Sequence, residues 1–458
     1  LHRVDRRQRQ MCIRDRSIQA MLKQLYRRTP HGIRPGLDRI QALLEALGHP
    51  EKSLVCIHVA GTNGKGSVCA TIESVLRAGG CRTGLYTSPH LVRFNERIRV
   101  NGRSVTDEHL ARLLARVEPI ADQLDRSPGA PRPCTFFELT TAMAFEHFRD
   151  EHIDVAVLET GMGGRLDATN VVLPAVAAIC DIGLDHQPYL GSTIEAIAAE
   201  KAGIIKPGRP VVMSVQAPEA RAVIEETARH LRAPLIRAEE VVTIERRRAD
   251  WKGQELRIQT SDRVLRPVRF PLPGAHQLRN VATAVAVLEQ FSALTGVELT
   301  EKTWKRGLET VFWPARLQMI EEQPPTLLDS GHNPHAASAL ASALRELAGK
   351  RPIGLIVGMA SDKDHVGFFR AVAPVVSRVW TVAIRGDRST PASVLAEAAR
   401  AAGCRAEVSA LRTARAEART WALTCDGVLC IAGSLYLAGE VLEEMIGNQD
   451  LYEKGTGN

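Results

Sequence analysis

The sequence predicts an α/β protein, with a doubly wound first domain followed by a smaller, Rossmann-like α/β domain. Three observations support this fold class. Short β-rich runs alternate with helical patterns, a glycine-rich loop joins the first such run to the first helix, and the alternation restarts after Trp313-Pro314. The chain has 458 residues, of which 45% are hydrophobic, so it is long enough to bury the cores of roughly two or three domains.

The first domain is expected to open with a strand, a loop and a helix. Leu54 to Ala60 is predicted as a buried strand, Gly61 to Gly66 as a tight loop, and Ser67 to Ala78 as a helix that ends at Gly79-Gly80. The later elements of this domain are a helix over Thr135 to Arg149, strands over Ile153 to Leu158 and Ala175 to Cys180, and a helix from Thr193 to about Ala202.

The second domain repeats the alternation on a smaller scale. We expect a first domain over residues 21–312, a linker over residues 313–317 and a second domain over residues 318–450. The elements predicted after the linker are a strand at Leu327-Leu328, a helix over Ala336 to Leu347, and strands over Ile353 to Met359, Val379 to Ile384 and Val428 to Ala432.

The net charge of +7 is concentrated at the start of the chain. Residues 1 to 16 hold six arginines against Asp5 and Asp15, a net charge of +4, which leaves +3 for residues 17 to 458. We expect residues 1 to 20 to be a non-native or disordered basic tail, with the native start at or near Met21. Two further basic clusters, Arg27-Arg28 and Arg246 to Arg248, lack interleaved aromatic residues, so we expect no nucleic-acid partner.

The apolar runs and the cysteines indicate a cytoplasmic protein. No apolar run reaches the roughly 18 residues that span a bilayer, and the N-terminus lacks the apolar segment of a signal peptide. The nine cysteines are odd in number and contain no C-x-x-C pair, so we expect reduced core residues rather than disulfides or metal ligands. We expect a monomer without a membrane partner.

The stretch HVAGTNGKGS, residues 58 to 67, departs from the usual sequence pattern of a phosphate-binding loop. A Walker loop reads G-x-x-x-x-G-K-[ST], whereas only two residues separate Gly61 from Gly64 here. Glycines let backbone N–H groups turn toward an anion, the start of the following helix adds a partial positive charge, and Lys65 adds a full one. The loop therefore predicts a phosphate site. The alternative is an ordinary strand-to-helix turn with a solvated lysine.

Polar side chains follow three further predicted strands. They are Ser88 and His90, then Glu159, then Asp185 and His186. Taken singly, each has a plainer interpretation as a turn residue, a capping carboxylate or a loop histidine. Because open α/β sheets bind ligands at the carboxyl ends of their strands, we expect these side chains to converge. Oxygen atoms of Ser88 and Glu159 suit Mg²⁺ beside nucleotide phosphates, and His186 is expected to bind a second metal ion.

Nine stretches of the sequence together resemble a known family. They are GTNGKGS, TSPHLVRFNERI, FFELTTAMAF, ETGMGGRLDATN, LDHQPYLGSTIEAIAAEKAGIIKPG, PGAHQLRNVATA, DSGHNPHAA, GMASDKD and GSLYLAGE. Their order is similar to that of the folylpolyglutamate synthase and dihydrofolate synthase family of the Mur-ligase superfamily, over essentially Leu25 to Glu440. In that family the short phosphate loop is the usual form.

The resemblance implies an ATP-dependent carboxylate–amine ligase. ATP would phosphorylate a pterin-linked carboxylate, of dihydropteroate or of a folate, and the amino group of L-glutamate would attack the acyl phosphate to give an amide. A carboxylate needs this activation because oxide is a poor leaving group, and the charge on the transferring phosphoryl oxygens must be neutralised by lysine and metal ions. Water must be kept from the acyl phosphate, which favours a cleft that closes between two domains.

The resemblance also implies which residues bind ATP and metal ions. Ser88 and Glu159 would bind a first Mg²⁺ and His186 a second. The residues that would contact ATP are Asn63, Gly64, Lys65 and Gly66 at the phosphates, Asn280 near the base, and Arg316 and Asp329 from the side of the second domain.

Further residues are implied in catalysis and in pterin binding. Lys65, Asp329 and His332 would act in catalysis, and Lys201 occupies the position of a carbamylated lysine in the family. For Lys201 the plainer alternative is an exposed helix lysine. The residues that would contact the pterin are Gly32, Ile33, Arg34, Pro35, Thr135, Phe136, Phe137, Glu138, Leu166, Asp167 and Ala168.

Three local departures separate this chain from the family pattern. The usual Pro-Gly-Arg before the second domain is Pro314-Ala315-Arg316, which predicts a stiffer linker. Ser330-Gly331 stands before His332 where the family commonly has other small residues, and Pro188 follows His186 closely. None of these changes removes a predicted ligand.

Two other classes of function stay open at this point. A cell-wall Mur ligase shares the ATP domain but normally carries a UDP-binding domain first, and only about 40 residues separate Met21 from Gly61, too few for a usual domain. A basic nucleic-acid-binding protein is the other alternative; its binding would fall steeply with salt and would depend on residues 1 to 16.

Overall fold

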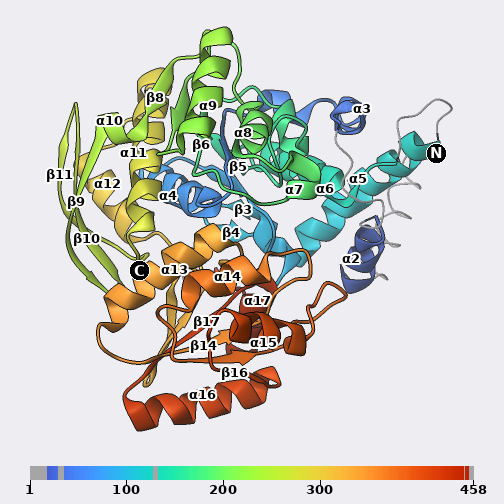
Figure 1. Cartoon of the computed structure of the whole chain (residues 1–458). Helices are drawn as coiled ribbons and strands as arrows, with labels where there is room; N and C mark the ends of the chain where they lie inside the picture. The colour runs from blue at the N-terminus through green and yellow to red at the C-terminus, as the bar shows by residue number, and fades with distance from the viewer. Residues whose placement is uncertain (1–17, 29–35, 127–132, 448, 453–458) are drawn as a thin grey trace.

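The computed structural model describes residues 18–28, 36–126, 133–447 and 449–452, which form two α/β domains in contact (Figure 1). Residues 1–17 of the predicted tail and the predicted pterin contacts Gly32, Ile33, Arg34 and Pro35 lie outside the described residues. Residues 18–20, at the end of the predicted tail, belong to helix α2 (Ile18–Tyr26). None of the described helices is long and apolar enough to cross a membrane.

An eight-stranded sheet forms the centre of the first domain. Its strands are β1 (Cys56–Ala60), β2 (Thr83–Tyr86), β3 (Ile98–Val100), β4 (Arg103–Ser104), β5 (Val155–Glu159), β6 (Val176–Ile179), β7 (Val211–Met213) and β8 (Leu235–Arg237). Their order is β4-β3-β2-β5-β1-β6-β7-β8. The six strands β2, β5, β1, β6, β7 and β8 run parallel to one another. At the other edge of the sheet, β3 is antiparallel to β2 and β4 is antiparallel to β3.

Helices cover both faces of this sheet, as the doubly wound prediction requires. One face carries α4 (Lys65–Ala78), α11 (His276–Thr295) and α12 (Glu301–Glu309). The other face carries α3 (Asp38–Ala46), α5 (Asp107–Arg126) and α6 (Phe136–Asp150) over one half, and α8 (Ile194–Ala202) and α9 (Pro218–His230) over the other. The short helical turns are η2 (Pro50–Ser53), η3 (Phe94–Arg97), η4 (Ala168–Val171), α7 (Gln187–Leu190) and α10 (Ala238–Val241).

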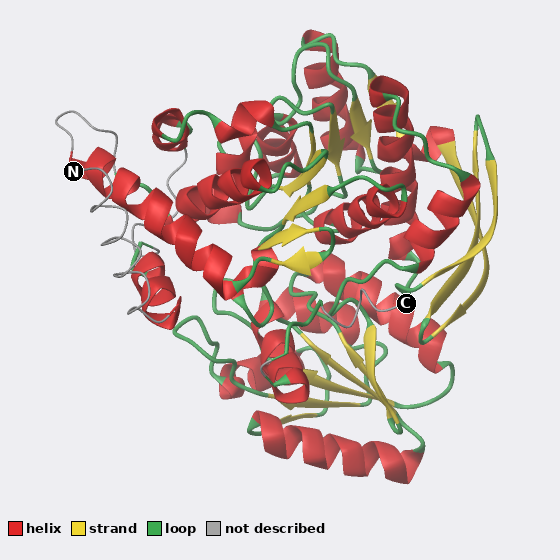
Figure 2. Cartoon of the chain, turned by 180° about the vertical axis from the view of Figure 1, so that it is seen from behind, coloured by secondary structure: helices red, strands yellow, loops and turns green. Residues whose placement is uncertain are grey.

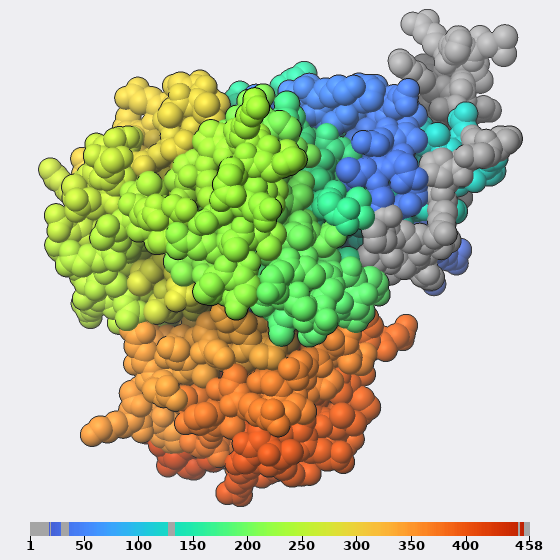
Figure 3. All heavy atoms as spheres, turned by 45° about the horizontal axis from the view of Figure 1, so that its top comes forward, coloured from blue at the N-terminus to red at the C-terminus, as the bar shows by residue number. Residues whose placement is uncertain are grey.

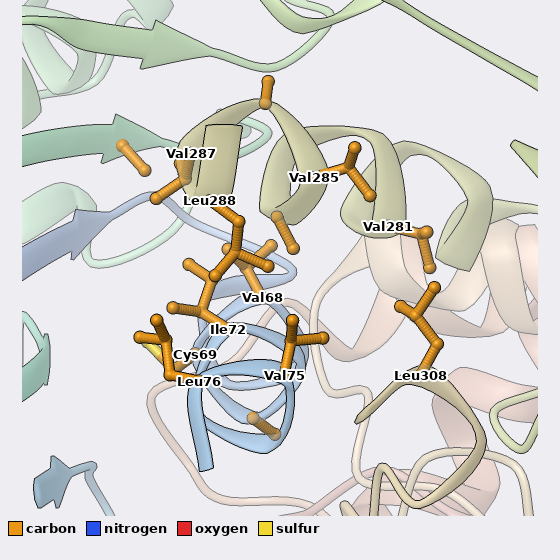
Figure 4. Packing of buried hydrophobic residues seen from close by; sticks show 14 of the residues in the cluster. Val68, Cys69, Ile72, Val75, Leu76, Val281, Val285, Val287, Leu288 and Leu308 are labelled. Atoms are coloured by element: carbon orange, nitrogen blue, oxygen red, sulfur yellow. The ribbon is translucent and has the colours of Figure 1, made fainter. Parts of the chain in front are cut away.

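Apolar packing fixes the position of α4 and therefore of the loop before it. Val68, Ile72 and Val75 on α4 are fully buried, and α11 lies across them with Val281 and Leu288 (Figure 4). Complete burial of one such side chain stabilises the fold by about 1.5–3 kcal/mol. The start of α4, where a phosphate would bind, is thus held rigidly against the sheet.

A three-stranded antiparallel sheet that the sequence did not predict lies beside α11 and α12 (Figure 1). It consists of β9 (Val242–Asp250), β10 (Gly253–Thr260) and β11 (Val264–Phe270) in the order β11-β10-β9. Leu256, Ile258 and Phe270 face the core beneath α11 and α12. The basic cluster Arg246 to Arg248 lies on β9 and is partly exposed, so these charges occupy the outer part of a strand rather than a loop.

The second domain is a six-stranded sheet between two layers of helices (Figure 2). Its strands are β12 (Gln318–Glu322), β13 (Pro325–Leu328), β14 (Ile353–Val357), β15 (Arg378–Thr381), β16 (Ala406–Val408) and β17 (Val428–Ala432), in the order β12-β13-β17-β14-β15-β16. All are parallel except β12. The helices are α13 (Pro334–Ala348), α14 (His365–Val372) and α15 (Ala392–Ala401) on one face and α16 (Leu411–Cys425) and α17 (Leu435–Ile446) on the other.

Two segments of the first domain reach into the second, which packs along its side (Figure 3). The tip of the β9–β10 hairpin places Trp251 against the core of the second domain, and Arg246 pairs with Glu346 at 2.7 Å. The loop between β2 and β3 places Leu91 and Val92 against the core beneath α16 and α17. These contacts fix how the two domains face each other.

The linker and the end of the described chain form a third connection. The guanidinium of Arg99 lies 4.8 Å from the ring centroid of Trp313 and 3.9 Å from that of Tyr452. Ala315 adopts φ = +55°, a left-handed conformation that normally favours glycine. The linker segment Pro314-Ala315-Arg316 therefore holds its alanine in a strained conformation.

The described cysteines are all free, and the predicted core position is wrong for Cys425. Six of them are buried, Cys81 is half-buried and Cys425 is exposed.

Candidate functional site

The candidate site lies at the carboxyl ends of β1, β2, β5 and β6, where four loops meet. These strands are neighbours in the sheet, so the loops that leave them come together at one edge. The loops begin at Gly61, Thr87, Thr160 and Cys180. The second domain covers this edge with the start of α13, where Asn333 contacts Asn63, and with the loop before α14, where Lys363 contacts Asp185.

The loop before α4 presents free N–H groups to an anion. The N–H groups of Thr62 and Asn63 donate to the Asp181 carbonyl at 2.9 and 3.1 Å, which fixes the loop against the neighbouring strand end. The helix begins at Lys65, two residues before the predicted start. Because the first turn of a helix has N–H groups without intrahelical partners, the groups of Lys65, Gly66 and Ser67 are available to phosphate.

Two glycines of this loop allow close contact with other elements. Gly64 has φ = +86°, and a Cβ atom there would lie 2.3 Å from Oδ1 of Asn280. A Cβ atom on Gly66 would lie 2.5 Å from the Trp313 ring. Asn280 and the linker therefore touch the loop directly, so Asn63, Gly64, Lys65, Gly66 and Asn280 are brought together as the sequence led us to expect.

Lys65 folds back over its own loop. Its Nζ donates to the carbonyls of Gly61 at 3.0 Å and of Thr62 at 3.5 Å. These acceptors are neutral and the ammonium has no direct ion pair among the described residues, which suits an anionic ligand.

Glu159 ends β5 and is 6% exposed. One carboxylate oxygen accepts a hydrogen bond from the Ser88 N–H at 3.1 Å. Burial raises the pKa of Glu159, against the lowering effects of Lys65, the Ser88 N–H and Arg316. A buried carboxylate whose charge is only partly compensated favours a cation beside it.

Asp185 is the centre of an ionic cluster that joins the two domains. Lys363 Nζ lies 3.0 Å from its Oδ1, and Nε2 of His332 and Nδ2 of Asn333 lie 3.5 and 3.3 Å from its Oδ2. Burial alone would raise the pKa of Asp185, but the hydrogen bond from His332 and the positive charge of Lys363 hold it well below its ordinary value. The carboxylate therefore stays charged and attracts the second domain to this edge.

A second pair of contacts reaches the phosphate loop from α13. Asn333 Nδ2 donates to Oδ1 of Asn63 at 3.1 Å, and Nδ1 of His335 lies 3.3 Å from Nδ2 of Asn63. Nε2 of His335 also lies 3.3 Å from Oδ2 of Asp181. The sequence did not identify Asn333, His335 or Lys363 as site residues, although two of the quoted stretches contain them, because nothing local links them to loops of the other domain.

His186 directly precedes the short helix α7 and has φ = +51°. Burial lowers the pKa of His186 to about 4, with Asp185 opposing this shift and the charges of Lys363 and Lys65 adding to it. The imidazole is therefore neutral at physiological pH, which is the form that binds metal ions. Pro188 stands in the first turn of α7, a position that tolerates proline, so it does not displace His186.

Arg316 and Asp329 hold the linker against the second domain. Oδ2 of Asp329 accepts from the Leu317 N–H at 3.0 Å and its Oδ1 from the Gly331 N–H at 2.8 Å. Arg316 donates to the hydroxyl of Ser330, and that hydroxyl donates to the Ala315 carbonyl at 3.0 Å. Ser330 thus orients Arg316.

Lys201 is buried on α8, with 4% of its surface exposed. Its Nζ donates to the Gly61 carbonyl at 2.8 Å, so the lysine reaches the phosphate loop. Burial, and then the charge of Lys65, lower the pKa of Lys201 to about 7. The alternative of an exposed helix lysine is therefore wrong.

The two described segments that were expected to contact a pterin lie in one apolar cluster. Phe136, Phe137 and Ala168 belong to it, and the ring of Tyr26 stacks on that of Phe136 with centroids 5.3 Å apart. Leu166 is half-buried and lies two residues before Ala168 in the sequence.

Three polar residues among the predicted pterin contacts have structural partners. Thr135 caps α6 and is bonded to Glu138. Glu138 also accepts from Arg39 at 2.9 Å. Asp167 accepts from the N–H groups of Met162 and Thr169 at 2.9 and 3.0 Å. The aromatic rings are thus the more available contacts.

No group of three or more His, Cys, Asp or Glu side chains in the described part of the chain has the arrangement of a metal site made by protein alone. Mg²⁺ beside nucleotide phosphates does not require one, because it keeps waters and uses one or two protein oxygens.

Two family models match the chain in tandem. The Mur ligase middle domain matches residues 59–288 and the Mur ligase glutamate ligase domain matches residues 315–435. Among proteins, the chain is 36% identical to the dihydrofolate synthase/folylpolyglutamate synthase of Bacillus subtilis over 82% of this chain and 87% of the relative. It is also 36% identical to the folylpolyglutamate synthase of Lacticaseibacillus casei over 90% of this chain and 94% of that one.

Solved structures agree with these relatives. Folylpolyglutamate synthase of Mycobacterium tuberculosis, complexed with ADP and AMPPCP, superposes with a TM-score of 0.87 at 33% identity, over 94% of this chain and 99% of the other. Escherichia coli FolC in complex with DHPP and ADP superposes with a TM-score of 0.83 at 30% identity, over 94% and 98% of the two chains. With this coverage and this identity, the chain belongs to the folylpolyglutamate synthase and dihydrofolate synthase family of Mur ligases.

Proposed function

We propose that this chain is an ATP-dependent ligase that joins L-glutamate to a pterin-linked carboxylate through an acyl phosphate, and that it accepts both dihydropteroate and folates. One observation carries the proposal: Lys65, Glu159 and the Asp185 cluster meet at one edge of the sheet, and Lys363 and His332 reach that edge from the second domain. Such a ligase needs a phosphate site, a carboxylate whose charge is only partly compensated and can attract a cation, and a second domain.

The reaction has two steps. A carboxylate oxygen of the pterin substrate forms a bond to the γ-phosphorus of ATP while the bond to ADP breaks. The nitrogen of glutamate then forms a bond to the acyl carbon, a proton leaves the nitrogen, and the bond from that carbon to the phosphate oxygen breaks. Lys65 and the free N–H groups of the first turn of α4 would hold the phosphoryl oxygens through both steps.

Glu159, Ser88 and His186 fit the metal ions that the family implies. Among the described residues, the Ser88 N–H is the one hydrogen-bond donor to the buried carboxylate of Glu159. His186 is neutral because burial lowers its pKa to about 4. Glu159 and the Ser88 hydroxyl would bind Mg²⁺, and His186 a second ion. Bound Mg²⁺ would neutralise charge on the transferring phosphoryl group.

Lys201 fits a carbamate. CO₂ reacts with a neutral amine, and a lysine whose pKa falls to about 7 exposes that amine at physiological pH. The carbamate would reverse the sign of the charge beside Lys65 and supply oxygen donors of the kind that Mg²⁺ prefers. An unmodified ammonium at this buried position would instead repel metal ions.

The second domain would complete the site when it closes. His332 and Asp329 are proposed to act near the incoming glutamate and ATP, with Arg316 and Asn280 on the nucleotide. The pair between Lys363 and Asp185 is largely shielded from solvent, with side-chain exposures of 12% and 11%. This closed arrangement would exclude water from the acyl phosphate.

The apolar cluster with Tyr26, Phe136 and Ala168 would take the pterin. Aromatic stacking offers the flat ring a complementary surface. We further propose that the protein works as a monomer and has no nucleic-acid partner.

The test is a product analysis. The protein is incubated with ATP, Mg²⁺, L-glutamate and either dihydropteroate or tetrahydrofolate, and the products are identified by mass. We expect one glutamate added to dihydropteroate and at least one added to tetrahydrofolate, with one ADP formed per amide. A UDP-linked muramoyl acceptor serves as the control, and we expect no product from it. A folded protein that adds glutamate to neither pterin would contradict the proposal.

A further inference from the structure

Arg97 is a buried cation without an anionic partner. It is 7% exposed and ends the turn η3, in the loop that follows β2. Its Nε donates to Nδ1 of His90 at 2.8 Å. Among the described residues, no carboxylate forms an ion pair with this guanidinium, and its two terminal nitrogens have no hydrogen-bond acceptor.

The nearby carboxylates have other partners. Glu96 accepts the N–H groups of Leu91, Val92 and Arg93 at 2.8, 2.9 and 2.6 Å. Glu159 accepts the Ser88 N–H. Burial lowers the pKa of Arg97, and the more distant Tyr86, Tyr26, Glu96 and Glu159 only oppose that effect. An unpaired buried charge costs several kcal/mol, so its presence indicates an anion that arrives with a ligand.

The position of the guanidinium indicates which anion. It lies 5.1 Å from the ring centroid of Phe136 and 5.7 Å from that of Phe94. Phe136 is one of the proposed pterin contacts, and Tyr26 stacks on it. The same loop carries Ser88, whose N–H holds Glu159 at the phosphate edge. Arg97 therefore belongs to the segment that connects the pterin contacts with the site of phosphoryl transfer.

His90 fixes the orientation of this guanidinium. Because an arginine nitrogen can only donate, Nδ1 of His90 must accept, and the proton of the neutral imidazole is on Nε2. The ring also contacts Phe94, with centroids 6.1 Å apart. With Nε held by His90, the two terminal nitrogens are left as a fork.

We propose that this fork binds the pterin-linked carboxylate that is to be phosphorylated, with His90 as the residue that positions Arg97. This inference rests on the proposed function. A planar guanidinium matches the two oxygens of a carboxylate, and it would hold the carboxylate in place until one oxygen attacks ATP. The aromatic rings on which Arg97 lies would contact the flat pterin ring of the same substrate. One region of the site would therefore bind both the pterin and the carboxylate.

The experiment compares an acid with its neutral ester. Binding of dihydropteroate and of dihydropteroate methyl ester is measured by fluorescence titration without ATP, for the wild type and for Arg97→Met. We expect the wild type to prefer the acid by roughly 10- to 100-fold, the range expected for hydrogen bonds to a charged group. Arg97→Met should lose this preference, while its affinity for the ester stays within about threefold of wild type, because methionine keeps the apolar contacts.

Arg93→Met is the matched control, because Arg93 lies on the same loop and pairs with Asp107 at 2.9 Å. It should keep the wild-type preference for the acid. Arg97→Met should also melt at or above the wild-type temperature, since the change removes an unpaired buried charge. A purely structural role for Arg97 would lower the melting temperature instead.

Several results would overturn the proposal. One is an Arg97→Met variant that keeps the preference for the acid, and another is one that loses affinity equally for acid and ester. If the methionine variant does not fold, Arg97→Lys decides the question: it keeps the charge without the fork and should show an intermediate preference, whereas an equal loss for both ligands would contradict the role. Wild-type protein that binds neither compound would overturn the proposed function itself, which this variant series distinguishes from a failure of Arg97 alone.

Discussion

Gly439→Ala tests whether the domain arrangement described here is the active one. Gly439 lies on α17 of the second domain, and a Cβ atom there would lie 2.1 Å from the carbonyl oxygen of Leu91 in the first domain. Real Cβ atoms essentially never approach another heavy atom within 3.0 Å, so the helix and the loop must separate by about 1 Å, and a misplacement of this size can cost about 100-fold in rate. We therefore expect kcat/KM to fall by about 100-fold.

The stability of the variant should not fall with its activity. Alanine favours a helix over glycine by about 1 kcal/mol, so α17 itself gains stability. The assay pairs steady-state kinetics with a circular-dichroism melt, and Met445→Ala is the control because Met445 is exposed on the same helix, at 45%. Activity of Gly439→Ala within threefold of wild type would refute the argument that the contact between α17 and Leu91 belongs to the active arrangement.

Three further variants test single residues. Lys65→Ala should reduce turnover at least ~100-fold with an unchanged melting curve, because it removes an electrostatic contact to the phosphoryl group; activity within a few-fold of wild type would mean that the loop does not hold phosphate. Lys201→Ala should lose activity that acetate or formate partly restores, and wild-type protein in ¹³C-labelled bicarbonate should show a carbamate signal; a fully active variant would contradict the carbamate. Burial lowers the pKa of His58 from 6.5 to about 3, so the unfolded chain takes up a proton below about pH 6.5 that the folded chain refuses, and stability is lost as the pH falls from 6.5 toward 3. His58→Leu should make that loss shallower in urea unfolding, and an unchanged pH dependence would argue against the buried neutral imidazole.

The elements whose residues follow a clear local pattern could be predicted from the sequence. β1, the glycine loop and α4 follow one another within a short stretch, and each has its own periodicity or turn residues. The predicted strand over residues 54 to 60 is β1, which the structure begins at Cys56, and the predicted helix begins at Lys65. The small sheet was missed because β9 carries Glu245 and Arg246 to Arg248 on a strand with few inward apolar residues, so its charges outweighed its weak alternation.

Some residues of the candidate site could likewise be predicted from the sequence, and others could not. Lys65 and Glu159 were identified because each follows a predicted strand, and the carboxyl ends of parallel strands share an edge. Lys363 could not be connected with Asp185, because the two are 178 residues apart and meet only when the domains pack. Arg97 lies in a quoted stretch, but its lack of an anionic partner is a property of the folded chain and has no sequence pattern.

The central claim is that a carboxylate is activated as an acyl phosphate, and an isotope measurement tests it most directly. Dihydropteroate labelled with ¹⁸O in its carboxylate is incubated with the enzyme, ATP, Mg²⁺ and L-glutamate, and the inorganic phosphate is examined by mass spectrometry. Because the bond that breaks in the second step joins the acyl carbon to an oxygen of the original carboxylate, we expect one ¹⁸O atom in phosphate for each amide formed. Unlabelled phosphate beside the glutamate product would contradict the account.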